Sequence, residues 1–253
     1  MSTTAAGPIA ASLPEAPVWR GAMYRALALA LSYPDAASVE QLAVDLDDLI
    51  EHPLTAERKL FAATAALREA IREADAPTLG ARYHDLFDGE VACSPYETEY
   101  EFDAFAKARQ LEDIAGFYRA FGLKAAADDA AAPADFVATE MEFLSHLALK
   151  LALAEAEGEE ERAAVTREAL KGFIEDHPGQ WLPLFCRTLV SLEDVDAFYG
   201  AAACLCDAFM QAEIELVGAR PRPAMVRRAS REMEEVLTCP MAAPDDEREE
   251  ELA

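Results

Sequence analysis

Carboxylates are the most abundant side chains capable of chemistry, and they far outnumber histidines and cysteines. The chain carries 48 Asp and Glu residues but only 4 histidines and 5 cysteines. A di-iron bundle would place Glu-x-x-His pairs on two helices, and the sequence contains no such pair. Glu142 and His146 lie four residues apart, a spacing that favours a helix-stabilising pair or a hydrogen bond over a metal site.

Other catalytic signatures are also missing. Cys204 and Cys206 point roughly 200° apart on a helix, so buried apolar thiols are expected there rather than zinc ligands. The chain has neither a glycine-rich phosphate loop nor a serine nucleophile elbow. We therefore expect no catalytic residues, no metal and no cofactor. A metal-dependent enzyme of helical-bundle type is the alternative.

The net charge of −26 limits the kinds of partner. Such a surface repels nucleic acid and anionic membranes and favours cationic peptides, although the charge could also serve solubility or a high-salt habitat. Residues 1–17 lack the pattern of a signal peptide, and no apolar run approaches the roughly 20 residues of a membrane span. The odd, scattered cysteines fit reduced thiols. These features predict a cytoplasmic protein without membrane insertion.

Helical periodicity dominates the chain, and convincing strand patterns are few. The prediction is an all-α fold, a single compact domain of about nine or ten helices over residues 18–238, between a disordered segment (1–17) and an acidic disordered tail (239–253). Thr55 and Asp135 are expected to act as N-caps, Gly158 to break a helix, and residues 124–134 to form a mobile connection. The expected helices cover residues 18–32, 38–50, 55–73, 79–87, 102–121, 135–157, 160–176, 178–191, 194–217 and 221–237.

Three segments stand out from this helical background. Residues 83–100 end one helix in aromatics and continue into a loop with Tyr96 and Tyr100, which suit a peptide-binding wall. The acidic side chains expected to rim this groove are Glu97, Glu99, Glu101 and Asp135. Packing on the protein's own core, with a capping Ser or Thr, would explain the same pattern. In residues 134–144, carboxylates close to a core stripe either cap helices or face a groove. Residues 173–185 combine aromatics with a histidine at a helix break, as expected for either helix-end packing or ligand contact.

Taken together, the order and spacing of five patterns resemble the TorD/DmsD/NarJ family of redox-enzyme maturation chaperones. They are Tyr-x-x-Leu-Phe-x-Gly (83–89), Ser-Pro-Tyr-Glu-Thr-Glu-Tyr (94–100), Gly-Phe-Tyr-Arg-Ala-Phe-Gly-Leu (116–123), Asp-x-x-x-x-Glu-x-Glu-Phe-Leu (135–144) and His-x-x-x-Trp (177–181). The resemblance covers about residues 24–216 and is nearest to chaperones of the dimethylsulfide, ethylbenzene or selenate/chlorate type. It implies a TorD-like helical fold without catalysis.

The resemblance also implies a partner. Such a chaperone binds the apo catalytic subunit of a molybdopterin oxidoreductase before export and assists insertion of its molybdenum cofactor. Many members also engage the subunit's twin-arginine signal peptide. An adaptor that binds the mature enzyme as well is another alternative, and the chain is expected to be a monomer or a dimer.

The residues expected to contact the client come from all three segments. Two departures from the family pattern concern this set: the loop often carries Trp-Gly where this chain has Tyr96-Glu97, and a histidine often stands at Phe136. A basic cluster, Arg220, Arg222, Arg227, Arg228 and Arg231, is expected to pair with the acidic surface or to contact the partner or a cofactor phosphate. The full set of expected client-binding residues is Tyr83, Phe87, Ser94, Pro95, Tyr96, Glu97, Thr98, Tyr100, Asp135, Phe136, Glu140, His177 and Trp181.

Overall fold

Every regular element in the described part of the chain is a helix. The computed structural model describes residues 17–88, 93–101, 103–123 and 133–224, and these ranges hold nine α-helices, two 3-10 turns and an isolated antiparallel bridge in place of any strand. The all-α prediction is confirmed. The elements are α1 (Pro17–Leu31), α2 (Ala36–Glu51), η2 (Pro53–Ala56), α3 (Arg58–Arg72), α4 (Ala76–Phe87), η3 (Glu97–Tyr100), α5 (Ala104–Ala120), α6 (Val137–Ala156), α7 (Glu160–Asp176), α8 (Pro178–Val190) and α9 (Ala197–Val217).

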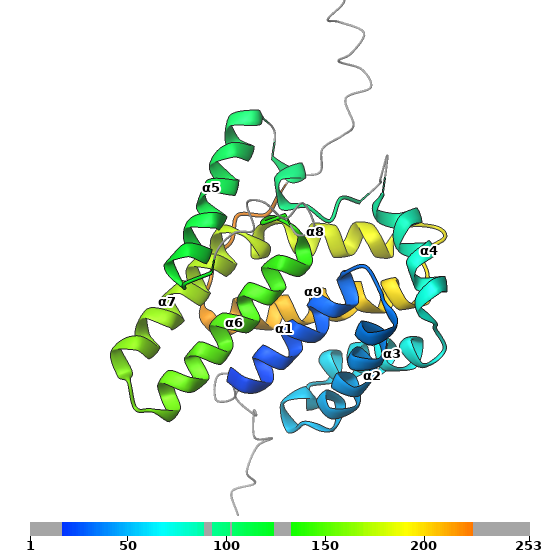
Figure 1. Cartoon of the computed structure of the whole chain (residues 1–253), viewed down its shortest axis with the longest axis horizontal. Coiled ribbons are helices and arrows are strands. Elements are labelled where there is room, and N and C mark those ends of the chain that lie inside the picture. Colours follow the sequence, from blue (N-terminus) through cyan, green and yellow to red (C-terminus); the bar gives the residue numbers. More distant parts are fainter. Residues whose placement is uncertain (1–16, 89–92, 102, 124–132, 225–253) are drawn as a thin grey trace, which may run out of the picture.

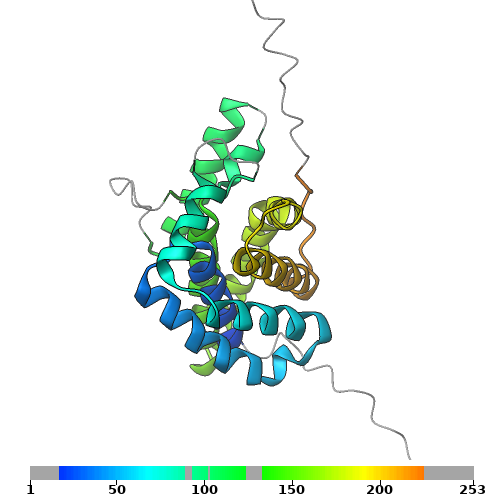
Figure 2. The same ribbon diagram turned by 90° about the vertical axis from the view of Figure 1, so that its right-hand side faces the viewer.

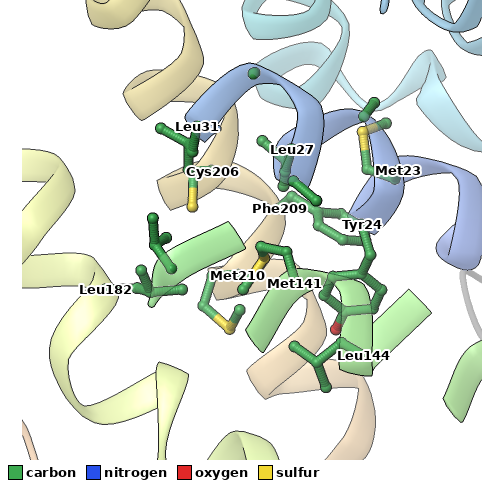
Figure 3. Packing of buried hydrophobic residues seen from close by; sticks show 14 of the residues in the cluster. Met23, Tyr24, Leu27, Leu31, Met141, Leu144, Leu182, Cys206, Phe209 and Met210 are labelled. Carbon is green, nitrogen blue, oxygen red and sulfur yellow. The ribbon is translucent and has the colours of Figure 1, made fainter. Parts of the chain in front are cut away.

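Helices α1, α6 and α9 form the centre of the fold (Figure 1). Helix α1 packs along α6, while α9 contacts α1, α3, α7 and α8. Apolar side chains from the three central helices fill the space between them, including Tyr24, Leu27, Met141, Leu144, Phe209 and Met210 (Figure 3). Burial of this apolar surface is the main force that holds the helices together.

Small residues let α1 approach α6 closely. A Cβ atom added to Gly21 would lie 3.2 Å from Cγ of Leu149, and the Ser145 hydroxyl donates a hydrogen bond of 2.8 Å to the Gly21 carbonyl. Ala26 and Ala30 are buried on α1 as well. This close packing fixes α6, and the first turn of α6 carries part of the candidate site.

Local signals decide most helix ends, as the sequence predicts. Gly158 and Gly218 have positive φ angles of 71° and 65° and end α6 and α9, a conformation that costs glycine little. The carboxylates of Asp103 and Asp196 accept backbone N–H groups in the first turns of α5 and α9. Because these aspartates are the N-caps, both helices begin a few residues later than predicted.

Two predicted N-caps are wrong. Glu57, not Thr55, caps α3; Thr55 is buried, accepts the Trp19 indole N–H at 3.1 Å and donates to the Leu49 carbonyl at 2.6 Å. Helix α6 has Phe136 at its N-cap position, without a side-chain cap. Both side chains form hydrogen bonds outside the helices that they were expected to cap, Thr55 with Trp19 and Leu49 and Asp135 with Thr98.

Further differences concern the end of the chain and one cysteine. Cys206 is buried as predicted, but Cys204 is exposed. The two residues lie on different faces of α9, and only the face with Cys206 packs against the core. Residues 221–224 are not helical. Pro17, the last residue of the expected disordered segment (1–17), is instead the first residue of α1. Four predicted stretches lie outside the described residues: the rest of the helix expected at 221–237 (225–237), residues 1–16, residues 124–132 of the expected connection and the acidic tail (239–253).

Candidate client-binding site

The loop before α5 is tied by its backbone to the start of α6. Val137 N–H donates to the Pro95 carbonyl, and Glu97 N–H donates to the Asp135 carbonyl, each at 2.9 Å. These two bonds enclose the antiparallel bridge between Tyr96 and Phe136. Two of the segments singled out in the sequence are therefore adjacent, although residues 102 and 124–132 between them are not described.

A buried carboxylate secures the same loop. Asp135 accepts the Thr98 hydroxyl at 2.6 Å and the Thr98 backbone N–H at 3.4 Å, and both residues are buried. The Tyr100 hydroxyl donates to the Ser94 carbonyl at 2.9 Å and closes the loop on itself. Asp135 was expected on the rim of a groove, but its burial shows that it holds the loop in place.

Glu97 is also buried rather than exposed on a rim. Only 2% of the residue is exposed. Its Oε1 lies 3.1 Å from Nδ1 of His177 and accepts a hydrogen bond from the Gln110 side chain. The other ring nitrogen of His177 lies 3.4 Å from a carboxylate oxygen of Asp113. The loop, α5 and the α7–α8 corner meet at this carboxylate.

Glu140 lies at the bottom of the network. It is fully buried and its Oε2 accepts the Trp181 indole N–H at 3.1 Å. Burial raises the pKa of Glu140 well above its usual value, and the charge of Glu97 and the hydrogen bond between the two carboxyls raise it further. These effects favour the protonated form of the Glu140 carboxyl over the charged form. Glu140 neither caps a helix nor faces a groove.

Aromatic side chains provide the partly exposed surface of the site. The rings of Tyr96 and Phe136 lie 5.5 Å apart between centroids, and both residues are half-buried. Tyr100 lies 5.2 Å from Trp181, which is buried. Because the backbone bridge fixes Tyr96 and Phe136, they form a rigid apolar wall that we call the aromatic pair.

Tyr83 and Phe87 belong to a neighbouring aromatic cluster and not to this wall. Their rings lie 5.0 Å apart, and Phe87 packs on Tyr199 and on Phe185, at 5.7 and 6.2 Å. Phe185 in turn contacts Trp181 at 5.5 Å. Burial raises the pKa of Tyr83 to about 12, so its hydroxyl stays neutral. Phe87 is buried, so its contribution is to pack beneath the site.

A pocket of about 160 Å³ opens beside the buried carboxylates. Three of the expected client-binding residues, Glu97, Tyr100 and Trp181, line it with the loop neighbour Glu101, together with side chains that were not expected in the site. Gln110 and Gln180 carried no distinguishing signal, whereas Arg222 belonged to the recognised basic cluster. The lining residues are Glu97, Tyr100, Glu101, Gln110, Gln180, Trp181, Arg222, Pro223 and Ala224.

Of the predicted basic cluster, Arg220 and Arg222 fall in the described part, whereas Arg227, Arg228 and Arg231 lie outside it. The backbone N–H of Arg220 donates a hydrogen bond to the Glu175 carboxylate at 3.0 Å.

Within the described residues no group of three or more His, Cys, Asp or Glu side chains could hold a metal ion. None of the described helices is long and apolar enough to cross a membrane.

Known proteins share this sequence pattern. The family model described as "Nitrate reductase delta subunit" matches residues 55–187. The selenate reductase assembly chaperone protein of Thauera selenatis is 30% identical over 182 residues, which cover 71% of this chain and 81% of that protein. A crystal structure assigned as a redox enzyme maturation protein from Archaeoglobus fulgidus has a TM-score of 0.48 and 17% identity, and covers 76% of this chain and 93% of its own.

Proposed function

Because the chain belongs to the nitrate reductase delta subunit family, we propose that it is a cytoplasmic assembly chaperone for a molybdenum-dependent oxidoreductase and not itself an enzyme. Its client is the apo catalytic subunit. The chaperone holds this subunit, in part through its twin-arginine signal peptide, until the molybdenum cofactor has been inserted. The chain needs no cofactor of its own for this role.

The aromatic pair is the observation that carries the proposal. Tyr96 and Phe136 present partly exposed rings on a backbone that two hydrogen bonds hold in place. A rigid aromatic surface binds an apolar peptide segment at little cost in conformational entropy. Glu101, which lines the adjoining pocket, provides negative charge for the cationic part of such a peptide.

Co-purification tests the identity of the client. The tagged full-length chain is isolated from its host under conditions that induce a molybdenum enzyme, and the bound proteins are identified by mass spectrometry. We expect a molybdopterin oxidoreductase catalytic subunit that lacks its cofactor. Recovery of the cofactor-loaded subunit in equal amount would support the adaptor role instead, and consistent absence of the subunit would refute the proposal.

A Tyr96→Ala substitution tests the site. We expect affinity for the apo subunit to fall about tenfold or more, because aromatic anchors dominate binding energy at such interfaces. Isothermal titration calorimetry measures the affinity. Phe105→Ala is the matched control, since Phe105 is an aromatic on α5 that is 86% exposed. Equal affinities of the two variants, with unchanged unfolding midpoints, would remove Tyr96 from the site.

A further inference from the structure

A short extended segment follows α9 and lies across the start of α8. The chain turns at Gly218, and residues 219–224, which we call the arm, then run beside α8 (Figure 2). Arg220 N–H donates to the Glu175 carboxylate at 3.0 Å, and Ala224 N–H donates to the Gln180 carbonyl at 2.8 Å. Two backbone donors therefore dock the arm on the corner between α7 and α8.

The surface beneath the arm is shaped to receive it. A Cβ atom added to Gly179 would lie 3.2 Å from Cβ and Cγ of Pro221, so the arm rests directly on glycine backbone. Ala219 is buried at the root of the arm. Beyond Pro221 the contacts are sparser, because Arg222 and Pro223 are exposed. The arm is thus held by packing at its root and by one backbone hydrogen bond at Ala224, while the side chains of Arg222 and Pro223 between them are exposed.

The tip of the arm lines the pocket of the candidate site. Arg222, Pro223 and Ala224 share this lining with the carboxylates Glu97 and Glu101. The remaining lining consists of Tyr100, Gln110, Gln180 and Trp181. Carboxylates, amide oxygens and aromatic faces are the groups that bind guanidinium or ammonium ions.

Arg222 is the only cation among the nine lining residues. Within the described part of the chain it takes part in no ion pair of 4 Å or less. The charge of Arg222 nevertheless affects a nearby carboxyl. Burial raises the pKa of Asp176, and the positive charge of Arg222 opposes that rise. An exposed cation held only by long-range attraction is inexpensive to displace.

We propose that the arm is a displaceable strap over a cation-binding pocket, and that Arg222 competes with a basic side chain of the client. With the strap docked, Arg222 supplies the positive charge in the pocket that Glu97 and Glu101 also line. A client arginine or lysine takes over this role when the tip of the strap leaves the pocket. Only molecules with an undocked strap bind the client, so the apparent affinity is the intrinsic affinity multiplied by the fraction of undocked molecules. This inference rests on the proposed function, because it assigns the basic part of the client peptide to this pocket.

A reversible cross-link tests the competition in the full-length chain. Residues 180 and 224 are joined by a backbone hydrogen bond of 2.8 Å, so Gln180→Cys with Ala224→Cys brings two thiols within reach of a disulfide. The probe is a fluorescent synthetic peptide with two adjacent arginines followed by an alanine–leucine stretch. We expect oxidation to weaken binding by about tenfold or more and reduction to restore it. The wild-type chain, oxidised in the same way, controls for its own cysteines.

Arg222→Ala provides the opposite change. We expect roughly threefold or tighter binding of the arginine peptide, no gain for a peptide in which glutamines replace both arginines, and wild-type affinity for Arg222→Lys. If the locked strap binds as tightly as the reduced one, or if Arg222→Ala weakens binding, the strap is overturned while peptide binding stands. If no form of the chain binds the arginine peptide, signal-peptide binding fails and the strap falls with it.

Discussion

Two buried polar networks hold distant parts of this chain together, and they differ in how completely they are balanced. In the first, Arg20 on α1 donates to both carboxylate oxygens of Glu213 on α9, with Nε at 2.8 and 3.0 Å, and the Tyr24 hydroxyl donates to the same carboxylate. Both charged residues are buried. One positive and one negative charge cancel, and both oxygens of the carboxylate are satisfied.

The second network lies beside the pocket and has an excess of acid. Glu97, Asp135 and Glu140 are buried, His177 lies beside Glu97, and the raised pKa of Glu140 favours the protonated form of that carboxyl. A closed, neutral network serves to join two central helices. An acidic network that borders a pocket can in addition attract a cation, which is why we place the binding function there.

Loss of the balanced pair has the largest expected effect. Arg20→Met leaves Glu213 buried without its counter-charge, which costs about 3–5 kcal/mol in the free energy of unfolding. Urea denaturation followed by circular dichroism measures this loss. Peptide affinity of the folded variant should stay unchanged, because the pair lies outside the site.

The double variant Arg20→Met with Glu213→Leu is the matched control. It removes both charges, so we expect it to recover most of the lost stability. A loss below about 1 kcal/mol in the single variant would show that Glu213 is not held by Arg20 in the way described.

A smaller effect is expected where the loop is anchored. Thr98→Val keeps the shape of the side chain but removes the 2.6 Å hydrogen bond to Asp135, at a cost of about 1.5–3 kcal/mol for a bond to a carboxylate. Peptide affinity should fall with it, because the same loop positions Tyr96. Thr98→Ser retains the hydroxyl and should behave as wild type in both measurements. If Thr98→Val bound the peptide with wild-type affinity, the hydrogen bond that anchors the loop would not be needed for peptide binding.

The third expected effect appears as a pH dependence. Glu140 has a raised pKa in the folded chain, so its contribution to stability is full below the pKa of an unfolded Glu, about 4.3, and is lost as pH rises toward the folded pKa. The loss is about 1.4 kcal/mol per pH unit across that window. Urea unfolding at pH 5 and pH 7 should therefore show a steeper decline for wild type than for Glu140→Gln. Parallel declines would mean that Glu140 is ionised when folded.

Helix content and several helix ends were predictable from the chain alone because single residues decide them, whereas the N-caps expected at Thr55 and Asp135 were wrong. Gly158 and Gly218 end helices through their positive φ angles, and apolar periodicity predicts buried residues such as Met141 and Leu144. Cys204 shows the limit of this reasoning: the spacing to Cys206 already placed the two thiols on different faces, and only packing shows which face is buried.

The candidate site was predictable in its residue types but not in their roles. Clustered aromatics and carboxylates identified the loop and the start of α6, yet Glu97 and Asp135 were expected on a rim. Their burial depends on partners far away in sequence, since Glu97 contacts His177 across 80 residues and Glu140 contacts Trp181 across 41. Caps and turns are decided within a few residues of chain, whereas desolvation and charge balance arise only when distant helices meet. Tertiary structure alone therefore decides that burial raises the pKa of Glu140 and that Arg222 lines the pocket.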